Sequence, residues 1–301
     1  MLAHQGALGD WVLTFPILRG LGALGPTLAV APWSKAQLAA AVIAGLTPAD
    51  IEAPPWPGFL RGDDAPSGGA VSAGAAGVAS AARFGADDII ISFVNRADDP
   101  WAAPGDGRAP PGRRFLVDPR PPADWTGHVS AWHAQQLARQ GLTLPQVGLP
   151  VRRRERGPVV IHPGSGGRDK CWPCARFVEV AQALRRRGRE AVVVLGEVEL
   201  ERWPRPRIEE LMHRHGAQAL TDLADLHAML ECAAAFIGND AGPTHLAAQL
   251  GVPTLALFGP TAPSLWRPIG PAVTVLAPPK PCPMSWLPAA TVRARLDALN
   301  V

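Results

Sequence analysis

The chain has 301 residues, 47% of them hydrophobic, which is enough apolar material for two domains of about 150 residues each. Its net charge of +3 is too small for the concentrated basic face of a nucleic-acid-binding domain. It contains no apolar run of about 18 residues, and no basic cluster precedes its first apolar stretch. We therefore predict neither a transmembrane helix nor a secretory signal. Four cysteines do not make a disulfide framework and indicate a reducing, cytoplasmic compartment.

The N-terminal segment predicts a glycine loop that opens a helix. Residues 4–10 read His-Gln-Gly-Ala-Leu-Gly-Asp, and an apolar stretch follows. Gly6 and Gly9 allow the backbone to approach a substrate closely. Asp10 either projects into a substrate cleft or caps the helix as its N-cap residue. Only three residues precede the loop, so a central strand here is either very short or lacks its beginning in this chain.

The rest of the first half alternates predicted strands and helices with two long loops. Strands are expected at 27–31, 50–53 and 88–94, and helices at 34–44, 73–84 and 127–139. Residues 54–79 and 96–125 are rich in proline and glycine and predict loops. Four arginines in these loops either contact acidic groups of a substrate or are solvated: Arg61, Arg96, Arg113 and Arg114. A linker at 143–157 separates predicted domains at 1–150 and 151–301.

The second half contains a predicted phosphate-binding turn. A strand at 159–161 enters the loop His-Pro-Gly-Ser-Gly-Gly of residues 162–167, and a helix is expected at 173–187. A glycine loop between a strand and a helix can bind phosphate through its backbone N–H groups. Lys170 adds a mobile positive charge for the same phosphate. A strand at 191–196 and three glutamates, Glu197, Glu199 and Glu201, come next.

A second strand-turn-helix unit follows at 235–258. The strand at 235–237 ends in a turn, Pro243 starts a helix that stops at Gly251, and another strand covers 252–258. Asp240, Thr244 and His245 therefore lie at a helix N-terminus and at the carboxyl end of a parallel strand. Ligands bind at that edge, and the helix dipole favours an anion there. A closing helix is expected at 291–299, with packing on the first domain as one alternative.

Cys171 and Cys174 form a Cys-x-x-Cys pair at the start of the helix at 173–187. This spacing is typical of thioredoxin-type redox sites, and a zinc site would need two more ligands. No second pair of this spacing exists in the chain. We interpret both residues as ordinary thiols, and we expect no metal and no cofactor.

Three segments resemble the signatures of glycosyltransferase family 9, the ADP-heptose:lipopolysaccharide heptosyltransferases. The first match comprises Gly6, Gly9, Asp10, Pro16 and Leu21. The second comprises His162, Pro163, Gly164, Ser165, Lys170, Trp172, Pro173, Arg176 and Phe177. The third comprises Asn239, Asp240, Gly242, His245, Leu246, Ala247, Ala248, Gly251, Pro253, Leu257, Phe258, Gly259, Thr261 and Pro263. The chain departs from the family at Ala241, where a serine or threonine is usual.

The resemblance implies a GT-B fold, in which two Rossmann-like α/β domains face each other across a cleft. It implies inverting transfer of a heptose from an ADP-sugar to a hydroxyl of a lipopolysaccharide-type or other glycan, with Asp10 as general base. Gly6 and Gly9 would then lie on the acceptor side. The implied donor-binding residues on the second domain are Gly164, Ser165, Lys170, Glu199, Asp240, Ala241, Gly242, Thr244 and His245.

Several alternatives remain open at this stage. Glu199 either contacts the nucleoside of the donor or is an exposed first-turn glutamate. The same fold can use another nucleotide sugar, or the chain can be a non-catalytic nucleotide-sugar-binding module. A redox role of the cysteine pair is a further alternative. A cytoplasmic enzyme that also contacts the inner face of the membrane is compatible with the basic composition, and the sequence does not give the oligomeric state.

Overall fold

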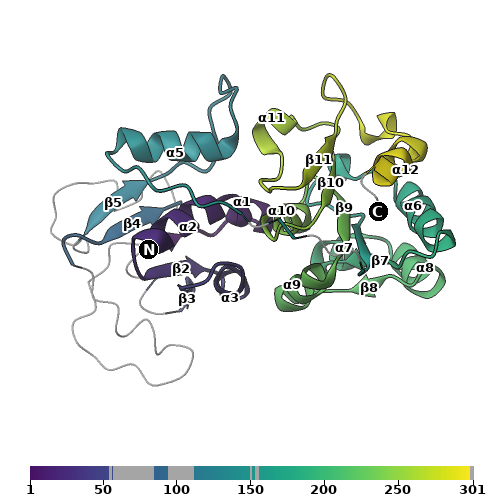
Figure 1. The fold of residues 1–301 in the computed structure, drawn as a ribbon, viewed down its shortest axis with the longest axis horizontal. Helices are drawn as coiled ribbons and strands as arrows, with labels where there is room; N and C mark the ends of the chain where they lie inside the picture. Colours follow the sequence, from purple (N-terminus) through teal and green to yellow (C-terminus); the bar gives the residue numbers. More distant parts are fainter. Residues whose placement is uncertain (54–55, 57–84, 94–111, 150, 153–155, 299–301) are drawn as a thin grey trace. The chain divides into compact units, whose positions relative to one another are not determined.

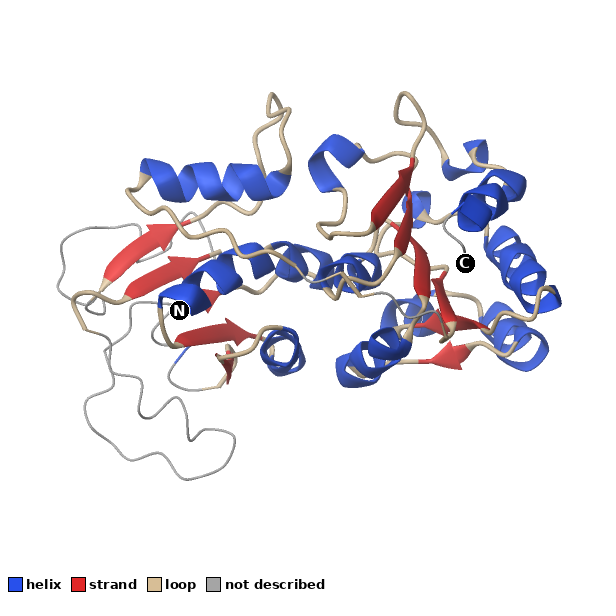
Figure 2. Cartoon of the chain, in the orientation of Figure 1, coloured by secondary structure: helices blue, strands red, loops and turns tan. Residues whose placement is uncertain are grey.

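The computed structural model describes residues 1–53, 56, 85–93, 112–149, 151–152 and 156–298. The chain divides into two compact units (Figure 1). The first comprises Met1–Trp125 and Val129–Val147, and the second comprises Thr126–His128 and Gly148–Val301. Helices and strands alternate through both units (Figure 2).

The first unit is built on a parallel sheet. Its described strands are β1 (Leu2–Ala3), β2 (Thr27–Ala31), β3 (Leu46–Asp50), β4 (Ile89–Ser92) and β5 (Arg113–Leu116). Its described helices are α1 (Leu8–Leu13), α2 (Phe15–Leu24), α3 (Trp33–Val42) and α5 (Val129–Arg139). In the part of the chain that the structure describes, the strand order is β3-β2-β1-β4-β5 with every pairing parallel. This is the order of a Rossmann-like half.

β1 is central although it is only two residues long. It pairs with β2 on one side and with β4 on the other, and Leu2 and Ala3 are completely buried. The hydrogen bonds continue beyond the strand, because the His4 amide donates to the Val30 carbonyl at 2.9 Å. As expected from the sequence, the part of this central strand that the chain contains is very short.

Two expectations for the first sheet are wrong. The strand expected at 50–53 is β3 at Leu46–Asp50, and Arg113 and Arg114 lie in β5 instead of in a loop. Both strands are sheet edges. An edge strand tolerates Pro48, whose ring nitrogen cannot donate to a ladder, and it tolerates charged side chains. The usual sequence signs of a buried strand are therefore missing from both.

The second unit has a larger parallel sheet. Its described strands are β6 (Val159–His162), β7 (Ala191–Leu195), β8 (Gln218–Ala219), β9 (Ala235–Asn239), β10 (Thr254–Leu257) and β11 (Val273–Leu276). Its described α-helices are α6 (Cys174–Arg186), α7 (Glu197–Arg202), α8 (Arg205–His215), α9 (Leu223–Cys232), α10 (Gly242–Gln249), α11 (Pro263–Trp266) and α12 (Ala289–Ala298). Two short 3-10 helices, η3 (Arg168–Lys170) and η4 (Met284–Trp286), complete it. Among the described strands the order is β11-β10-β9-β6-β7-β8.

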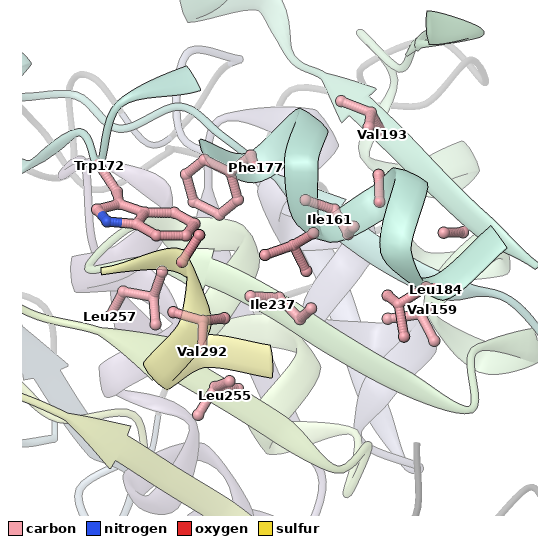
Figure 3. Packing of buried hydrophobic residues seen from close by; sticks show 14 of the residues in the cluster. Val159, Ile161, Trp172, Phe177, Leu184, Val193, Ile237, Leu255, Leu257 and Val292 are labelled. Atoms are coloured by element: carbon pink, nitrogen blue, oxygen red, sulfur yellow. The ribbon is translucent and has the colours of Figure 1, made fainter. Parts of the chain in front are cut away.

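The core of the second unit follows the period of its strands. Val159, Ile161 and Ile237 point to one face of the sheet and pack against Phe177 of α6 and Val292 of α12 (Figure 3). The intervening Val160 and Phe236 are equally buried but lie outside this cluster. Apolar residues on both faces are typical of a parallel sheet covered on both sides, and they explain the continuous apolar runs in the sequence.

The last helix packs within the second unit. Val292 and Leu296 of α12 belong to the same buried cluster as α6, and Arg293 pairs with Glu179 of α6. The sequence had left packing on the first domain as an alternative, and the contacts described for α12 are with α6.

The sequence missed α8, β8 and β11. The helix expected at 73–84, the loop at 54–79 apart from Trp56, and the two arginines Arg61 and Arg96 lie outside the described residues. No helix in the described ranges is long and apolar enough to cross a membrane.

A buried histidine beside β1 cannot easily become charged. His4 is 2% exposed and packs against the rings of Trp11 and Phe93, each with its centroid 5.6 Å away. Burial, together with the charge of Lys35 and the neighbouring His133, lowers the pKa of His4 from 6.5 to about 3. The folded state therefore binds this proton more weakly than the unfolded chain does.

We predict that His4 makes the protein less stable in mild acid. The stability that the neutral His4 ring contributes is fully present above the unfolded-state pKa of 6.5. It is lost as the pH falls towards the folded-state value of about 3. Between pH 7.5 and 5.5 the free energy of unfolding should fall by about 1.4 kcal/mol from this residue. Urea unfolding of His4→Asn should show a flatter pH dependence, and the exposed control His213→Asn should keep the parent slope. An unchanged slope in His4→Asn would contradict the assignment.

Candidate functional site

The candidate site lies where the strand order of the second sheet reverses. The chain leaves β6 towards β7 on one side, and β9 lies on the other side of β6. In open parallel sheets, ligands bind at this switch point, outside the carboxyl ends of the strands. His162 ends β6 and Asn239 ends β9, and His162 is paired with Gly238 in the register. The loops that follow both strands therefore start side by side.

Asn239 joins the two loops through its side-chain amide. Its Nδ2 donates to the carbonyl of Pro163 at 2.9 Å and to that of Gly164 at 3.1 Å. Its Oδ1 accepts from the amide of Trp172 at 3.0 Å. Asn239 is completely buried, so these bonds are not exchanged with water. One side chain thus fixes both ends of the loop at 163–172 against the end of β9.

The carboxylate of Asp240, the next residue, is the common hydrogen-bond partner of three polar side chains of the site. Its Oδ2 accepts from Lys170 Nζ and from Thr261 Oγ1, each at 2.9 Å, and its Oδ1 lies 3.4 Å from His245 Nε2. Burial alone would raise the pKa of Asp240, but the hydrogen bond and charge of His245 and the ammonium of Lys170 outweigh it. The pKa of Asp240 is therefore lowered, and the carboxylate is ionised at neutral pH.

The helix after Asp240 presents its amino end to the same place. Ala241 is the N-cap of α10, and Pro243 lies in the first turn, where its missing N–H costs no hydrogen bond. The amides of Thr244 and His245 turn back to the Ala241 carbonyl. The helix ends before Gly251, which has φ of 75° as expected for a residue after a helix. The amides of Ala241 and Gly242 precede the first amide that bonds within the helix, so they have no acceptor inside α10.

Three predicted donor-site side chains are engaged inside the protein. Thr244 is completely buried and donates its hydroxyl to the Asn239 carbonyl. Ser165 Oγ donates to the Asp240 carbonyl at 2.9 Å, and it is 9% exposed. His245 is 4% exposed. These side chains shape and stiffen the turn, while Lys170, with a third of its side chain exposed, can reach a ligand.

Glu199 is buried and not an exposed first-turn glutamate, so that alternative is wrong. It is 2% exposed, its Oε2 lies 3.1 Å from His162 Nε2, and the Gly196 amide donates to the same oxygen at 2.9 Å. Burial would raise the pKa of Glu199, but the bonds from His162 and Gly196 outweigh it and lower this pKa. A Cβ atom at Gly164 would overlap the Glu199 carboxylate, so any other residue there would displace the Glu199 side chain.

The cysteine pair lies beside the site without forming one. Both thiols are half-buried and unpaired in disulfides. Burial raises the pKa of Cys171 and of Cys174, which is opposite to the shift of a reactive thiol. Among the described residues, no group of three or more His, Cys, Asp or Glu could hold a metal ion. Trp172, between the cysteines, is completely buried and donates to the Leu287 carbonyl at 2.9 Å.

Asp10 lies in the first turn of α1 and does not cap it. The N-cap residue is Ala7, so the capping alternative is wrong. The loop before α1 follows β1, which borders β4 at the switch point of the first sheet. A Cβ atom at Gly6 would lie 2.5 Å from a ring carbon of His4 and 3.3 Å from the Asp10 Cβ. Gly6 therefore allows the loop to fold tightly around Asp10.

The structure thus brings together the predicted residues of the second unit at one sheet edge. The sequence analysis named three residues that build this site only as signature matches and gave them no role: His162, Asn239 and Thr261. His162 and Asn239 are the last residues of β6 and β9, and Thr261 lies in the loop after β10. The missing information was that each side chain bonds another loop, and such a partner is far away in the sequence.

Two parallel sheets of Rossmann-like order in one chain, with the polar cluster at a switch point, define a GT-B architecture. The family model described as "Glycosyltransferase family 9 (heptosyltransferase)" matches residues 126–285, more than half of the chain. The chain belongs to glycosyltransferase family 9. The loop that carries Asp10 lies outside the matched range.

Curated relatives match over shorter segments. Lipopolysaccharide heptosyltransferase 3 of Escherichia coli is 34% identical over 116 residues, which are 36% of this chain and 33% of the relative. Lipopolysaccharide heptosyltransferase 1 of Pseudomonas aeruginosa is 34% identical over 124 residues, 41% of this chain and 34% of the relative. The matched segment thus spans about a third of the length of each of these relatives.

Solved structures match over nearly the whole chain. The E. coli heptosyltransferase WaaC with ADP has a TM-score of 0.66 at 18% identity, covering 99% of this chain and 98% of its own. A family 9 glycosyltransferase from Veillonella parvula has a TM-score of 0.69 at 19% identity, with coverages of 99% and 95%. At these identities the likeness establishes the fold.

We predict that Asn239 tolerates loss of its side chain better than a change to aspartate. Asn239→Asp keeps the size but sets an anionic oxygen against the carbonyls of Pro163 and Gly164. It should destabilise the protein by roughly 2–5 kcal/mol, more than Asn239→Ala does. Thermal melting of the two variants gives the order. If Asn239→Asp melts at or above Asn239→Ala, the two donated hydrogen bonds do not hold the loop.

Proposed function

We propose that the protein is an inverting glycosyltransferase that moves a heptose from an ADP-sugar to a hydroxyl of a lipopolysaccharide core. The observation that carries the proposal is the cluster at the switch point of the second sheet. There an ionised Asp240 holds Lys170 beside the amino end of α10. Family membership and the names of the matched relatives support the choice of substrates.

The diphosphate of the donor binds between Lys170 and the first turn of α10. Lys170 has three N–H donors and gives one to Asp240, which leaves two for phosphate oxygens. The amides of Ala241 and Gly242 and the helix dipole add further stabilisation for an anion. Charge builds up on the diphosphate as the bond to the sugar breaks, so the same groups stabilise the leaving ADP.

Ala241 binds the diphosphate through its backbone, so its missing hydroxyl does not remove this contact. Glu199 contributes by a different route. Its carboxylate packs against Gly164, where a side chain is absent, and bonds His162. Glu199 therefore supports the loop at 164–170 from inside the protein. Gly164 and Ser165 supply the loop backbone and its attachment to Asp240.

The acceptor hydroxyl loses its proton to Asp10. Inversion by direct displacement requires a base that takes this proton as the new glycosidic bond forms. Asp10 is partly exposed and is held by a glycine loop at the switch point of the first sheet. Gly6 and Gly9 let the acceptor approach the loop closely. The reaction needs no metal in this scheme, since Lys170 and α10 stabilise the leaving group.

The proposal predicts that Lys170→Ala weakens ADP binding without affecting adenosine. Loss of the ammonium removes a charged hydrogen bond and leaves Asp240 as an unbalanced anion beside the diphosphate. The loss should be roughly 1–3 kcal/mol, or about 5- to 150-fold in Kd. Titration calorimetry with ADP and adenosine measures it, with the exposed Lys280→Ala as control. Equal affinity of Lys170→Ala and the parent for ADP would place the diphosphate elsewhere.

The proposal also predicts that Asp10→Asn separates catalysis from donor binding. Asparagine cannot accept the proton, so kcat should fall about 100-fold or more, while the Kd of ADP stays unchanged. Stability should change by about 1 kcal/mol or less, because only a first-turn charge is lost. Transfer from ADP-heptose is followed with lipopolysaccharides truncated before and after each core heptose. Near-parent turnover of Asp10→Asn would show that another group is the base.

A further inference from the structure

Lys35 occupies a position that its own helix does not favour. It is the third residue of α3, and a cation in the first turn is repelled by the helix dipole. It also lies close enough to the buried His4 for its charge to lower the pKa of that ring. The helix gives no reason for a lysine here, so the reason lies in what its ammonium contacts.

The ammonium of Lys35 holds the loop that carries Asp10. Lys35 Nζ donates to the Gly6 carbonyl at 2.8 Å. The indole Nε1 of Trp11, the residue after Asp10, donates to the backbone carbonyl of Lys35 at the same distance. The start of α3 is therefore bonded to the loop before α1 and to α1 itself, at residues on either side of Asp10 in the sequence. Movement of one of these contacts changes the direction of the carboxylate.

His4 bonds the same loop, at the backbone N–H of Gly6. The Gly6 amide donates to His4 Nδ1 at 3.0 Å, which requires a neutral ring with its proton on Nε2. The low pKa of His4 keeps the ring in this form throughout the physiological range. Both backbone polar groups of Gly6 are thus bonded, its N–H to His4 and its carbonyl to Lys35. The loop that carries Asp10 has little freedom to reorient.

We propose that Lys35 is a positioning residue for Asp10, acting through its hydrogen bond to the Gly6 carbonyl. This inference rests on the proposed role of Asp10 as general base. A base that is misplaced by about 1 Å can lose about 100-fold in rate. The proposed donor-binding residues belong to the second unit, whereas the hydrogen bonds described for Lys35 are to Gly6 and Trp11.

A double-mutant cycle between Lys35 and Asp10 tests the inference in the full-length chain. Lys35→Met should lower kcat about 10- to 100-fold with an unchanged KM for ADP-heptose. Lys35→Arg, which can still donate to the Gly6 carbonyl, should recover most of the rate. In the Asp10→Asn background, Lys35→Met should cause little further loss, because residues that act as a unit are not additive. Lys280→Met is the matched control and should behave as the parent.

Each outcome of the cycle decides one of the two proposals. If Asp10→Asn is slow but Lys35→Met turns over at the parent rate, Lys35 does not position the base, and the proposed function stands. If Lys35→Met loses the same factor in both backgrounds, Lys35 acts independently of Asp10, and the inference is wrong. If Asp10→Asn turns over normally, the assignment of the base fails, and the inference fails with it. Thermal melting shows whether Lys35→Met is folded, and Lys35→Gln replaces it in the cycle if it is not.

Discussion

The buried amide of Asn239 is the interaction on which the second unit depends. A primary amide has donors on one side and an acceptor on the other, and Asn239 uses both against backbone groups of the loop at 163–172. Two backbone carbonyls and one backbone N–H would otherwise be buried without partners at the carboxyl ends of β6 and β9. Because each such group costs about 1–3 kcal/mol, the loop has few alternative conformations. A site built on it is preorganised before any ligand arrives.

The ion pair between Asp240 and Lys170 also depends on how the end of β9 meets the loop at 163–172. Asp240 is the first residue beyond β9 and is buried, so it needs partners to remain ionised. Lys170, Thr261 and His245 supply them from three different segments. The cost of burying a carboxylate is thus offset by contacts that also fix the direction of Lys170. The positive charge of Lys170, which the proposed function assigns to the diphosphate, is thus held in place by the protein itself.

The elements that the sequence predicted best are those buried on both faces. The strands at 159–161, 191–196 and 235–237 are uninterrupted apolar runs, and each is present as β6, β7 or β9 with ends that differ by at most two residues. The edge strands β3, β5 and β11 were misplaced or missed. An edge strand is paired on one side only, so proline, arginine and threonine are accepted there, and the apolar pattern disappears.

Only part of the candidate site could be predicted, because the sequence shows local signals but not contacts between distant residues. Local signals such as a glycine loop, a lysine and a helix start identified Lys170 and the turn at 240–245. They did not reveal that Asn239 holds the loop at 163–172, that His162 bonds Glu199, or that Thr244 and Glu199 face inward. These roles depend on partners between 5 and 76 residues away. A periodic pattern reports burial of a residue, but it does not report the atom that a buried polar side chain bonds.

The central claim is that the second unit is a preformed site for the diphosphate of an ADP-sugar. A crystal structure of the chain with ADP-heptose tests it most directly. The account predicts phosphate oxygens within hydrogen-bonding distance of Lys170 Nζ and of the Ala241 and Gly242 amides, with the loop at 163–172 unmoved. A nucleotide bound away from the carboxyl ends of β6 and β9, or a loop rebuilt around it with the Asn239 bonds broken, would contradict the account.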